Sequence, residues 1–266
     1  MPSPSQISTT KLARLIGTPD APTIVDVRTD EDFQTDSRFI PTAFRVDYTQ
    51  ALNVPKALLR DKVVVYCQKG KKLSEGVAAL FRSRNISAEI LIDGFHGWRD
   101  ANLPLVPLNK HIPVEPAAQS LWVTRHRPKI DRIACPWLIK RFVDPRARFL
   151  FVPPAEVLDV ADRFNAIPFD MQDVYFSHRG ELCTFDTMLS EFELGIPALL
   201  HMAEVIRAAD TDRLHVSPQA AGLLAVSLGL SRMYRNDLEQ LDASMLVYDA
   251  LYRWCRDATE ETHQWP

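Results

Sequence analysis

The apolar positions of the N-terminal part of the chain form short continuous runs separated by polar turns. The clearest run, Val63–Tyr66, has three β-branched residues and an aromatic residue, as in a strand buried on both faces of a parallel sheet. It is followed by Cys67, by a short segment with glycine and lysines, and by a helical pattern from Leu73 to Arg84. This part of the chain therefore predicts a βα arrangement, with a cysteine between a strand end and a helix start.

The apolar positions of the C-terminal part recur with helical spacing instead. Between Asp131 and Phe142, apolar residues stand at 130, 133, 134, 137, 138 and 142, which share one helical face. Further helices are predicted over 155–164, 185–192, 197–209, 218–230 and 237–256, and strands over 148–152 and 174–177. Thr184 and Ser217 are predicted to cap two of these helices. We expect this part to be mainly helical, with a few short strands.

Length and a series of prolines predict two domains. A chain of 266 residues is long for a single domain, and its hydrophobic content of 46% is sufficient for two cores. Pro104, Pro107, Pro113 and Pro116 interrupt any regular element between the two patterns. We therefore expect a first domain over 1–107, a Pro-rich linker over 108–120 and a second domain over 121–266.

Charge and cysteine content exclude several classes of protein. A formal net charge of −3 argues against a general binder of nucleic acids or anionic membranes. The four cysteines are widely spaced and form no CxxC pair, which argues against a disulfide framework and for a reducing compartment. No apolar run reaches the roughly 18 residues of a membrane span, and no N-terminal signal segment is recognisable. We expect a cytoplasmic protein with no membrane or nucleic-acid partner.

Cys67 has the surroundings of a reactive thiol. A thiol between a strand end and a helix N-terminus meets unpaired backbone N–H groups and the positive end of the helix dipole. Lys69, Lys71 and Lys72 add positive charge. These effects favour the thiolate, which is the nucleophilic form of cysteine. The alternative is a buried cysteine that only packs.

The segment around Cys67 resembles the active-site loop of the rhodanese family of sulfurtransferases. Thr23–Arg28 and Leu91–Trp98 match two further motifs of the family in the right order, although Phe39–Ala43 lacks the glycines and the histidine usual around its Ile-Pro. The resemblance implies an α/β domain with a parallel sheet and flanking helices. It also implies transfer of sulfane sulfur from a donor such as thiosulfate, through a Cys67 persulfide, to a thiophilic acceptor. The residues expected to bind the donor, through lysine charge and a nest of backbone N–H groups, are Gln68, Lys69, Gly70, Lys71, Lys72 and Leu73.

A phosphatase or arsenate-reductase loop is a neighbouring interpretation of the same cysteine. Such a loop has a cysteine, five further residues and then an arginine that clamps a tetrahedral oxyanion. Leu73 occupies the position of that arginine here. The missing guanidinium favours sulfur over phosphate.

The C-terminal part resembles the C-terminal domain of the bacterial chromate-resistance protein B family. The match rests on Trp122–Phe142, Phe169-Asp170, Ser177–Gly180, Cys183–Asp186 and Val247–Tyr252. The resemblance implies a role in oxyanion or metal stress, with chromate among the expected small-molecule partners. The combined expectation is a sulfurtransferase joined to a chromate-resistance-type domain. The alternative is a non-catalytic chromate or metal sensor in which the rhodanese-like domain is a relay or scaffold.

Several side chains in these matching blocks are of metal-ligand type. The sequence implies no certain cofactor, but Asp170, His178 after a predicted strand and Asp186 at a helix start are expected to meet at one rim and hold a divalent metal such as Fe, Mn or Zn. Helix capping and surface polarity are the alternative roles of these residues. Further residues of ligand type in or beside these blocks are His126, Asp131 and Asp210. A basic cluster that offers charge to an oxyanion consists of Arg125, His126, Arg127, Lys129 and Arg132.

Overall fold

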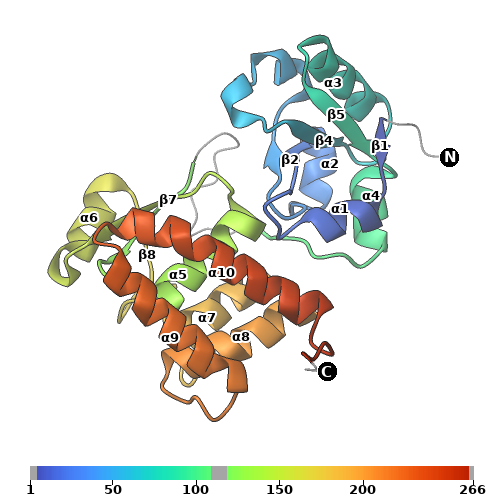
Figure 1. Ribbon diagram of the computed structural model, residues 1–266. Helices are drawn as coiled ribbons and strands as arrows, with labels where there is room; N and C mark the ends of the chain where they lie inside the picture. The colour runs from blue at the N-terminus through green and yellow to red at the C-terminus, as the bar shows by residue number, and fades with distance from the viewer. Residues whose placement is uncertain (1–4, 109–118, 264–266) are drawn as a thin grey trace. The chain divides into compact units, whose positions relative to one another are not determined.

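The computed structural model describes residues 5–108 and 119–263, and the chain divides into two compact units (Figure 1). The first unit comprises the residues up to 119 together with 140–145, and the second comprises 120–139 and the residues from 146 onward. Most of the predicted linker, residues 109–118, lies outside the described residues.

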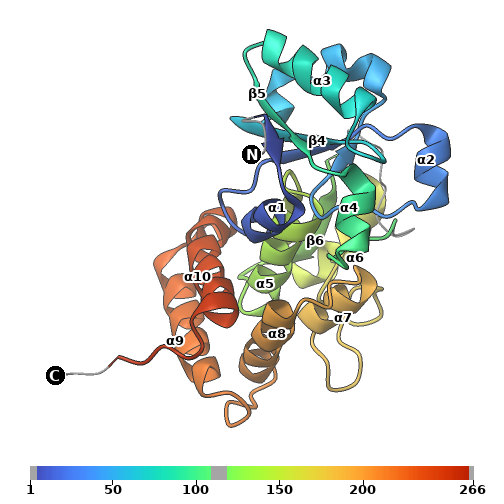
Figure 2. The ribbon, with the colours of Figure 1, turned by 90° about the vertical axis from the view of Figure 1, so that its right-hand side faces the viewer.

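The first unit is an α/β fold around a five-stranded sheet with the order β1-β5-β4-β2-β3. All four strand pairs are parallel. Figure 2 shows α3 on one face of this sheet and α1 and α4 on the other. The elements are β1 (Gln6–Ile7), α1 (Thr9–Leu15), β2 (Thr23–Asp26), α2 (Asp30–Thr35), β3 (Phe44–Arg45), the 3₁₀ turns η1 (Tyr48–Asn53) and η2 (Lys56–Leu58), β4 (Lys62–Tyr66), α3 (Lys72–Ser83), β5 (Ser87–Leu91) and α4 (Gly94–Asp100).

The strand β4 lies in the middle of the sheet, with β2 and β5 as its neighbours. Val63, Val64 and Val65 are each at most 1% exposed, because both faces of a parallel sheet are covered by helices. Val77 and Phe81 of α3 belong to the same core. The predicted strand and the α/β fold with a parallel sheet are confirmed.

The Asp-Val-Arg motif at the end of β2 forms a buried ion pair. The guanidinium of Arg28 donates to both carboxylate oxygens of Asp26, at 2.6 to 3.1 Å, and neither side chain is exposed. Arg28 also donates to the carbonyl oxygens of Asp36 and Arg38, and its guanidinium stacks 3.9 Å from the ring centroid of Phe95. The motif thereby connects the end of β2 to the loop after α2 and to α4. The Phe95 ring of α4 covers the guanidinium charge of Arg28.

The second unit combines a small parallel sheet of order β7-β6-β8 with a set of helices. It is mainly helical with a few short strands, as the periodicity predicts. Its elements are β6 (Leu121–Arg125), α5 (Asp131–Leu138), β7 (Arg148–Val152), the 3₁₀ turn η4 (Pro154–Glu156), α6 (Val157–Phe164), β8 (Ile167–Pro168), α7 (Thr184–Glu191), α8 (Pro197–Asp210), α9 (Pro218–Met233) and α10 (Asp237–Asp257). The π-helical turn η3 (Ile139–Val143) follows α5, and its residues from 140 onward belong to the first unit.

The long helix α10 packs against α5, α8 and α9. Leu241, Tyr248 and Tyr252 form its buried stripe, whereas Leu238 in its first turn is 51% exposed. The indole N–H of Trp137 on α5 donates to the Asp249 carboxylate at 2.8 Å, which satisfies a polar group inside this packing.

Two sequence-based expectations for this unit are wrong in detail. The segment 174–177 is not a strand: only Phe176 forms a bridge, with Phe169, because its ring packs on Trp122 and Phe192 while the neighbouring residues turn. Thr184 does not cap α7. Cys183 occupies the cap position and Thr184 is the first residue of the helix.

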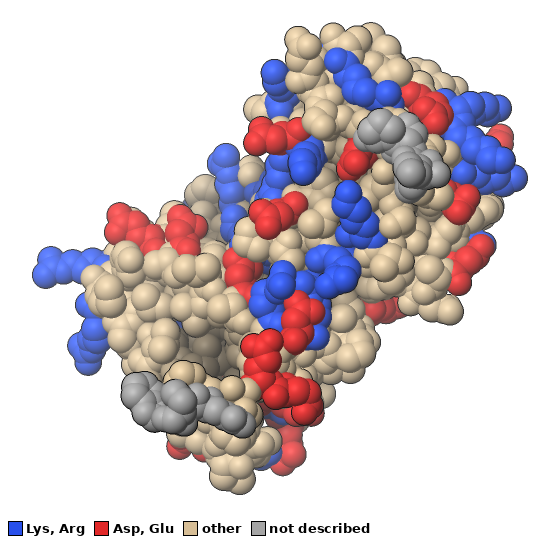
Figure 3. All heavy atoms as spheres, turned by 45° about the vertical axis from the view of Figure 1, so that its right-hand side comes forward, with Lys and Arg blue, Asp and Glu red and all other residues tan. Residues whose placement is uncertain are grey.

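Charge is mixed on the face of the molecule drawn in Figure 3, where basic and acidic side chains are interspersed. This distribution agrees with the small net charge. Among residues 5–108 and 119–263, no helix combines the length and the apolar character that a membrane crossing requires.

Candidate functional site

Cys67 lies at the carboxyl end of the central strand β4, in the loop that leads to α3. We call residues 67–71 the cysteine loop. In parallel α/β sheets, ligands bind outside the carboxyl ends of the strands. Cys67 is 5% exposed, so the loop holds the sulfur just below the surface.

The Cys67 sulfur is held by donors from the cysteine loop and from α3. Its Sγ accepts a hydrogen bond from the Lys71 backbone N–H at 3.4 Å and lies 3.4 Å from the Ser74 Oγ. Burial opposes ionisation of the thiol, but hydrogen bonds from Ser74, Lys71 and Lys69 outweigh it, so that the pKa of Cys67 lies below its ordinary value. The site therefore favours the nucleophilic thiolate.

Ser74 is a site residue that the sequence analysis did not single out. It lies in the first turn of α3, seven residues after Cys67. Its hydroxyl donates to the Lys71 carbonyl at 2.9 Å, so its single proton is shared between this oxygen and the Cys67 sulfur. The available signal was its place in the first turn of a helix that starts beside a cysteine, where a hydroxyl can reach back to the loop.

The glycine-containing turn between β5 and α4 contacts the cysteine loop through backbone atoms. The N–H groups of Phe95 and His96 donate to the carbonyl oxygens of Cys67 and Gln68 at 3.0 and 3.1 Å. Gly70 and Gly94 both have positive φ, +62° and +56°, and a Cβ on Gly94 would lie 2.2 Å from the Cys67 carbonyl oxygen. The turn after β5 thus fixes the loop by backbone contact, which explains the glycine in the motif Leu91–Trp98.

The remaining predicted donor-binding residues surround this sulfur in different ways. Lys69, Lys71 and Lys72 are exposed, Gly70 and Leu73 are half-buried and Gln68 is buried. The side chain of Leu73 packs against the core of the first unit, so only its backbone can serve a ligand. Any charge offered to an anionic donor therefore comes from the three exposed lysines.

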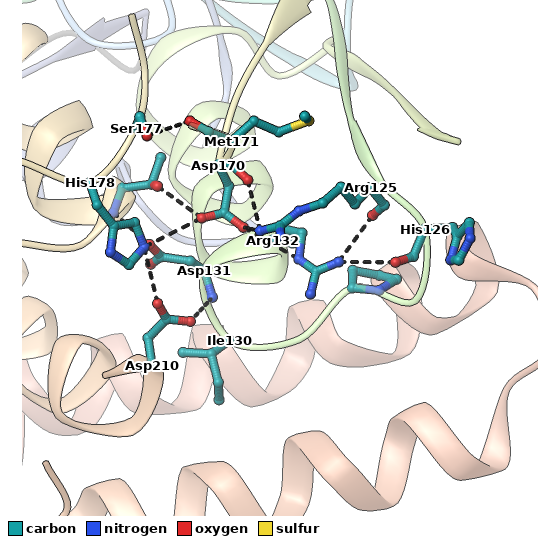
Figure 4. Close-up of polar contacts among 12 residues, drawn as sticks. Arg125, His126, Ile130, Asp131, Arg132, Asp170, Met171, Ser177, His178 and Asp210 are labelled. Atoms are coloured by element: carbon teal, nitrogen blue, oxygen red, sulfur yellow. Dashed lines mark hydrogen bonds and ion pairs between the residues drawn. The ribbon is translucent and has the colours of Figure 1, made fainter. Parts of the chain in front are cut away.

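A second group of reactive side chains lies in the second unit, where three carboxylates converge on one imidazole (Figure 4). His178 Nε2 lies 3.5 Å from Asp131 Oδ2, 3.5 Å from Asp170 Oδ1 and 3.2 Å from Asp210 Oδ2. We call these four residues the His–Asp cluster. Ligand atoms of Asp131, Asp170 and His178 lie within 4.8 Å of one another, as a shared metal ion requires.

Four different segments position the His–Asp cluster. Asp131 is the first residue of α5, Asp170 follows β8, His178 lies in the loop before α7, and Asp210 is the last residue of α8. Ile130, just before α5, has a positive φ of 36°, which is strained for a β-branched residue. Its carbonyl accepts from the Tyr248 hydroxyl at 3.0 Å, so that α10 holds the strained turn in place.

Asp131 is the most deeply placed of the three carboxylates. Its side chain is 1% exposed, and its Oδ2 accepts hydrogen bonds from the Thr184 and Phe185 N–H groups at the start of α7. Burial raises the pKa of Asp131, against the effect of the His178 hydrogen bond. The hydrogen bonds to Asp131, Asp170 and Asp210 raise the pKa of His178 in turn. The protonated imidazole of His178 therefore supplies the positive charge between the three carboxylates when no metal ion is bound.

Asp170 joins the cluster to the basic residues of the sequence. Its Oδ2 pairs with Arg125 at 3.0 Å and with Arg132 at 3.3 Å, while its Oδ1 accepts from the Thr184 hydroxyl at 3.0 Å. Burial opposes the charge on Asp170, but the contacts with His178 and the two arginines dominate and lower its pKa. Arg125 at the end of β6 and Asp170 after β8 meet because these parallel strands are neighbours.

The structure brings together only two of the three predicted metal ligands, Asp170 and His178. Asp186 lies elsewhere: its carboxylate accepts from the Cys183 N–H at 3.0 Å and pairs with Arg207 at 2.6 Å. This is a capping box, in which the third helical residue reaches back to the residue before the helix. Asp131 and Asp210 occupy the places beside His178.

The basic cluster of the sequence is divided in the structure. Arg125 and Arg132 face Asp170. Arg127 instead donates to the carbonyl oxygens of Tyr234 and Ser231 and to the Ser231 hydroxyl, at the end of α9. His126 and Lys129 are exposed. Only two of the five basic residues therefore border the His–Asp cluster.

Comparisons with known proteins match both units. Residues 122–255 match the family model described as ChrB, C-terminal domain, and residues 8–101 match the rhodanese-like domain. Protein ChrB of Cupriavidus metallidurans is 35% identical over 132 residues, which is 49% of this chain and 39% of that protein. The chain thus spans about two fifths of the length of this curated relative.

Two solved structures illustrate the likeness of the first unit. The thiosulfate sulfurtransferase of Pseudomonas aeruginosa is 22% identical, with 40% of this chain and 20% of that chain covered and a TM-score of 0.34. A rhodanese-like domain protein of Staphylococcus aureus is 24% identical, with 40% of this chain and 99% of that chain covered and a TM-score of 0.34. At these identities and TM-scores, the likenesses say nothing about activity.

Proposed function

Because the chain belongs to the family of the ChrB C-terminal domain and carries a rhodanese-like domain before it, we propose that it is a sulfurtransferase joined to a domain that acts in oxyanion or metal stress. Its small-molecule partners are a sulfane-sulfur donor such as thiosulfate and a thiophilic acceptor. The four unpaired cysteines suit a reducing compartment, so we place the protein in the cytoplasm.

The observation that carries the proposal is the environment of the Cys67 sulfur. Its Sγ accepts from a backbone N–H at a strand end, and a hydroxyl on the following helix lies beside it. These contacts hold the pKa of the thiol below its ordinary value despite burial. A cysteine that only packs in a core has no such donors and has a raised pKa, as Cys255 does.

The reaction follows from this thiolate. Cys67 attacks the outer sulfur of thiosulfate, the sulfur–sulfur bond breaks, and sulfite leaves with the bonding electron pair. The outer sulfur remains on Cys67 as a persulfide. A thiolate or cyanide then attacks this terminal sulfur, takes it as a persulfide or thiocyanate, and returns Cys67 to the thiolate. Backbone N–H groups of the cysteine loop and the exposed lysines offset the negative charge of donor and persulfide.

The test is the intact mass of the protein after incubation with thiosulfate. We expect a gain of one sulfur atom that cyanide removes and that Cys67→Ser lacks. Cys135→Ser is the matched control, because Cys135 is fully buried in the second unit and its pKa is raised by burial; this variant should still gain the sulfur. Wild-type protein without the adduct would contradict the proposal.

A sensor without turnover is the second candidate function. Arg125 and Arg132 pair with Asp170 beside the partly exposed His178, and the buried Nε of Arg125 has no hydrogen-bond partner among the described residues. Chromate or another oxyanion would supply an acceptor for that donor. Thiosulfate:cyanide turnover separates the two candidates, because a scaffold or relay needs none.

A further inference from the structure

We propose that Asp131, Asp170, His178 and Asp210 bind a divalent first-row transition-metal ion, and that the mixed oxygen and imidazole donors select Mn²⁺, Fe²⁺ or Zn²⁺. This function belongs to the second unit and goes beyond the sulfur transfer proposed for Cys67. It also replaces the ligand set that the sequence suggested, since Asp131 and Asp210 take the place of Asp186.

The spacing of the donor atoms fits one ion. Ligand atoms about 2.1 Å from a metal lie about 3.4 Å apart at the corners of a tetrahedron, and about 3.0 Å apart along an octahedral edge. The three distances from His178 Nε2 to the carboxylate oxygens are 3.2, 3.5 and 3.5 Å. The donors of Asp131, Asp170 and His178 already lie within 4.8 Å of one another, and Asp210, whose Oδ2 contacts His178 Nε2, would complete the shell by moving toward them.

An unsatisfied buried oxygen independently points to a cation. Asp131 is fully buried, and its Oδ1 has no hydrogen-bond partner within the part of the chain that the structure describes. Leaving such an oxygen without a partner is costly, and a bound cation removes the cost. An anion cannot play this part, because a carboxylate oxygen accepts hydrogen bonds and repels negative charge.

The surroundings of the donors also resemble those of a built metal site. Carboxylates that bind metals are held by second hydrogen bonds, which fix the direction of the coordinating oxygen. The N–H group of Thr184 holds Asp131, the hydroxyl of Thr184 holds Asp170, and Arg125 and Arg132 hold the other Asp170 oxygen. Thr184 therefore serves two ligands at once, from the first position of α7.

The site is open on one side. The side chain of His178 is 41% exposed and that of Asp210 is 19% exposed, whereas Asp131 and Asp170 are buried. An ion can therefore enter past His178, and the imidazole binds it as the neutral ring, giving up the proton that it carries in the free cluster. The open side leaves room for water or for a small ligand on the metal.

Metal binding by the full-length protein tests the proposal. After removal of metals with a chelator, Zn²⁺ and Mn²⁺ are titrated separately by calorimetry, and bound metal is counted by elemental analysis after gel filtration. We expect one ion per chain for at least one of the two metals. Asp131→Asn and His178→Ala should each lower the affinity by at least about tenfold, because each removes a ligand. Mg²⁺, which rarely accepts imidazole, should bind more weakly than either ion.

The matched control is His126→Ala, which removes an exposed histidine of the same unit and should leave binding unchanged. Circular dichroism checks that each variant is folded, and Asp210→Asn provides a third ligand variant at a half-buried helix end. Absence of stoichiometric binding to the wild type would overturn the proposal and leave the cluster as an ion pair around a protonated histidine. Binding that survives in the ligand variants but is lost in His126→Ala would overturn it as well.

Discussion

At the scale of single residues, the reactivity of Cys67 depends on a balance between burial and hydrogen bonding. Burial disfavours the thiolate, and the side-chain hydrogen bond of Ser74 is the largest effect that favours it. A hydrogen bond to a charged group contributes about 1.5–3 kcal/mol, which corresponds to about 1–2 pH units. Ser74 is therefore the side chain that lowers the pKa of Cys67 most.

Replacement of Ser74 by alanine should raise the pKa of Cys67, because the variant lacks the hydroxyl beside the sulfur. The rate of alkylation by iodoacetamide follows the thiolate fraction, so it falls as the pH falls through the pKa. In wild-type protein this fall should occur below the ordinary pKa of a thiol, and in Ser74→Ala it should occur at higher pH. Ser83→Ala, an exposed serine of the same helix, is the control that should leave the profile unchanged. Equal midpoints for Ser74→Ala and wild type would show that the backbone N–H groups suffice.

The same scale shows what residue types alone could predict about the second site. The sequence pointed to two members of the His–Asp cluster, Asp170 and His178, but it could not decide among the aspartates. Asp186 could have been recognised as a capping residue, because it stands three residues after the cap of α7. Asp210 ends a helix 32 residues after His178, and no periodicity or spacing links the two. Their proximity arises only from the packing of α8 against α5 and α7.

At the scale of elements, the cysteine loop and the turn before α4 form one unit of backbone contact. A Cβ on Gly94 would lie 2.2 Å from the Cys67 carbonyl oxygen and 2.4 Å from the Gly70 nitrogen. Neither atom belongs to a flexible side chain, and the residue has a left-handed φ. A glycine is therefore required at position 94 for this close contact with the cysteine loop.

Gly94→Ala should lower the free energy of unfolding by at least about 2 kcal/mol, from left-handed strain and from the backbone clash. It should also slow sulfur loading of Cys67, since the loop must move away. Gly76→Ala is the opposite control: it lies inside α3, where a Cβ would meet no described atom within 4 Å, and alanine should stabilise the helix by up to about 1 kcal/mol. Urea denaturation followed by circular dichroism compares the two. Similar midpoints for both variants would contradict the interlocking of loop and turn.

Long or strongly patterned elements were predictable, and short ones were not. The strand β4 and the helix α10 form where the sequence predicts them. A run of β-branched residues strongly favours a strand, and a long apolar pattern with a period of 3.6 residues strongly favours a helix. The strand β8 has only two residues, and one of them is a proline, so no sequence pattern predicts it. It forms because the edge of β6 is available for parallel pairing. The wrongly predicted strand over 174–177 has strand-forming residue types, but only Phe176 is buried in the core.

At the scale of the whole molecule, each of the two units contains a complete candidate site. Cys67, Ser74 and the glycine turn all belong to the first unit, and the four members of the His–Asp cluster all belong to the second. No residue of one site is a ligand, donor or nucleophile of the other in the part of the chain that the structure describes. The two chemistries should therefore be separable by single substitutions.

His178→Ala should lower the metal affinity by at least about tenfold and leave the sulfur adduct on Cys67 unchanged. Cys67→Ser should lack the sulfur adduct and keep the metal affinity of the wild type. Intact mass after thiosulfate and calorimetric titration with Zn²⁺ and Mn²⁺ measure both properties on the same preparations. Thiolate is itself a strong ligand for Zn²⁺, so an ion bound at Cys67 would be lost in Cys67→Ser and retained in His178→Ala. That outcome would refute the assignment of the metal to the His–Asp cluster while leaving the reactivity of Cys67 intact. Loss of both properties in a folded His178→Ala variant would instead show that the sites are coupled, because no direct contact at the cysteine loop is removed by this substitution.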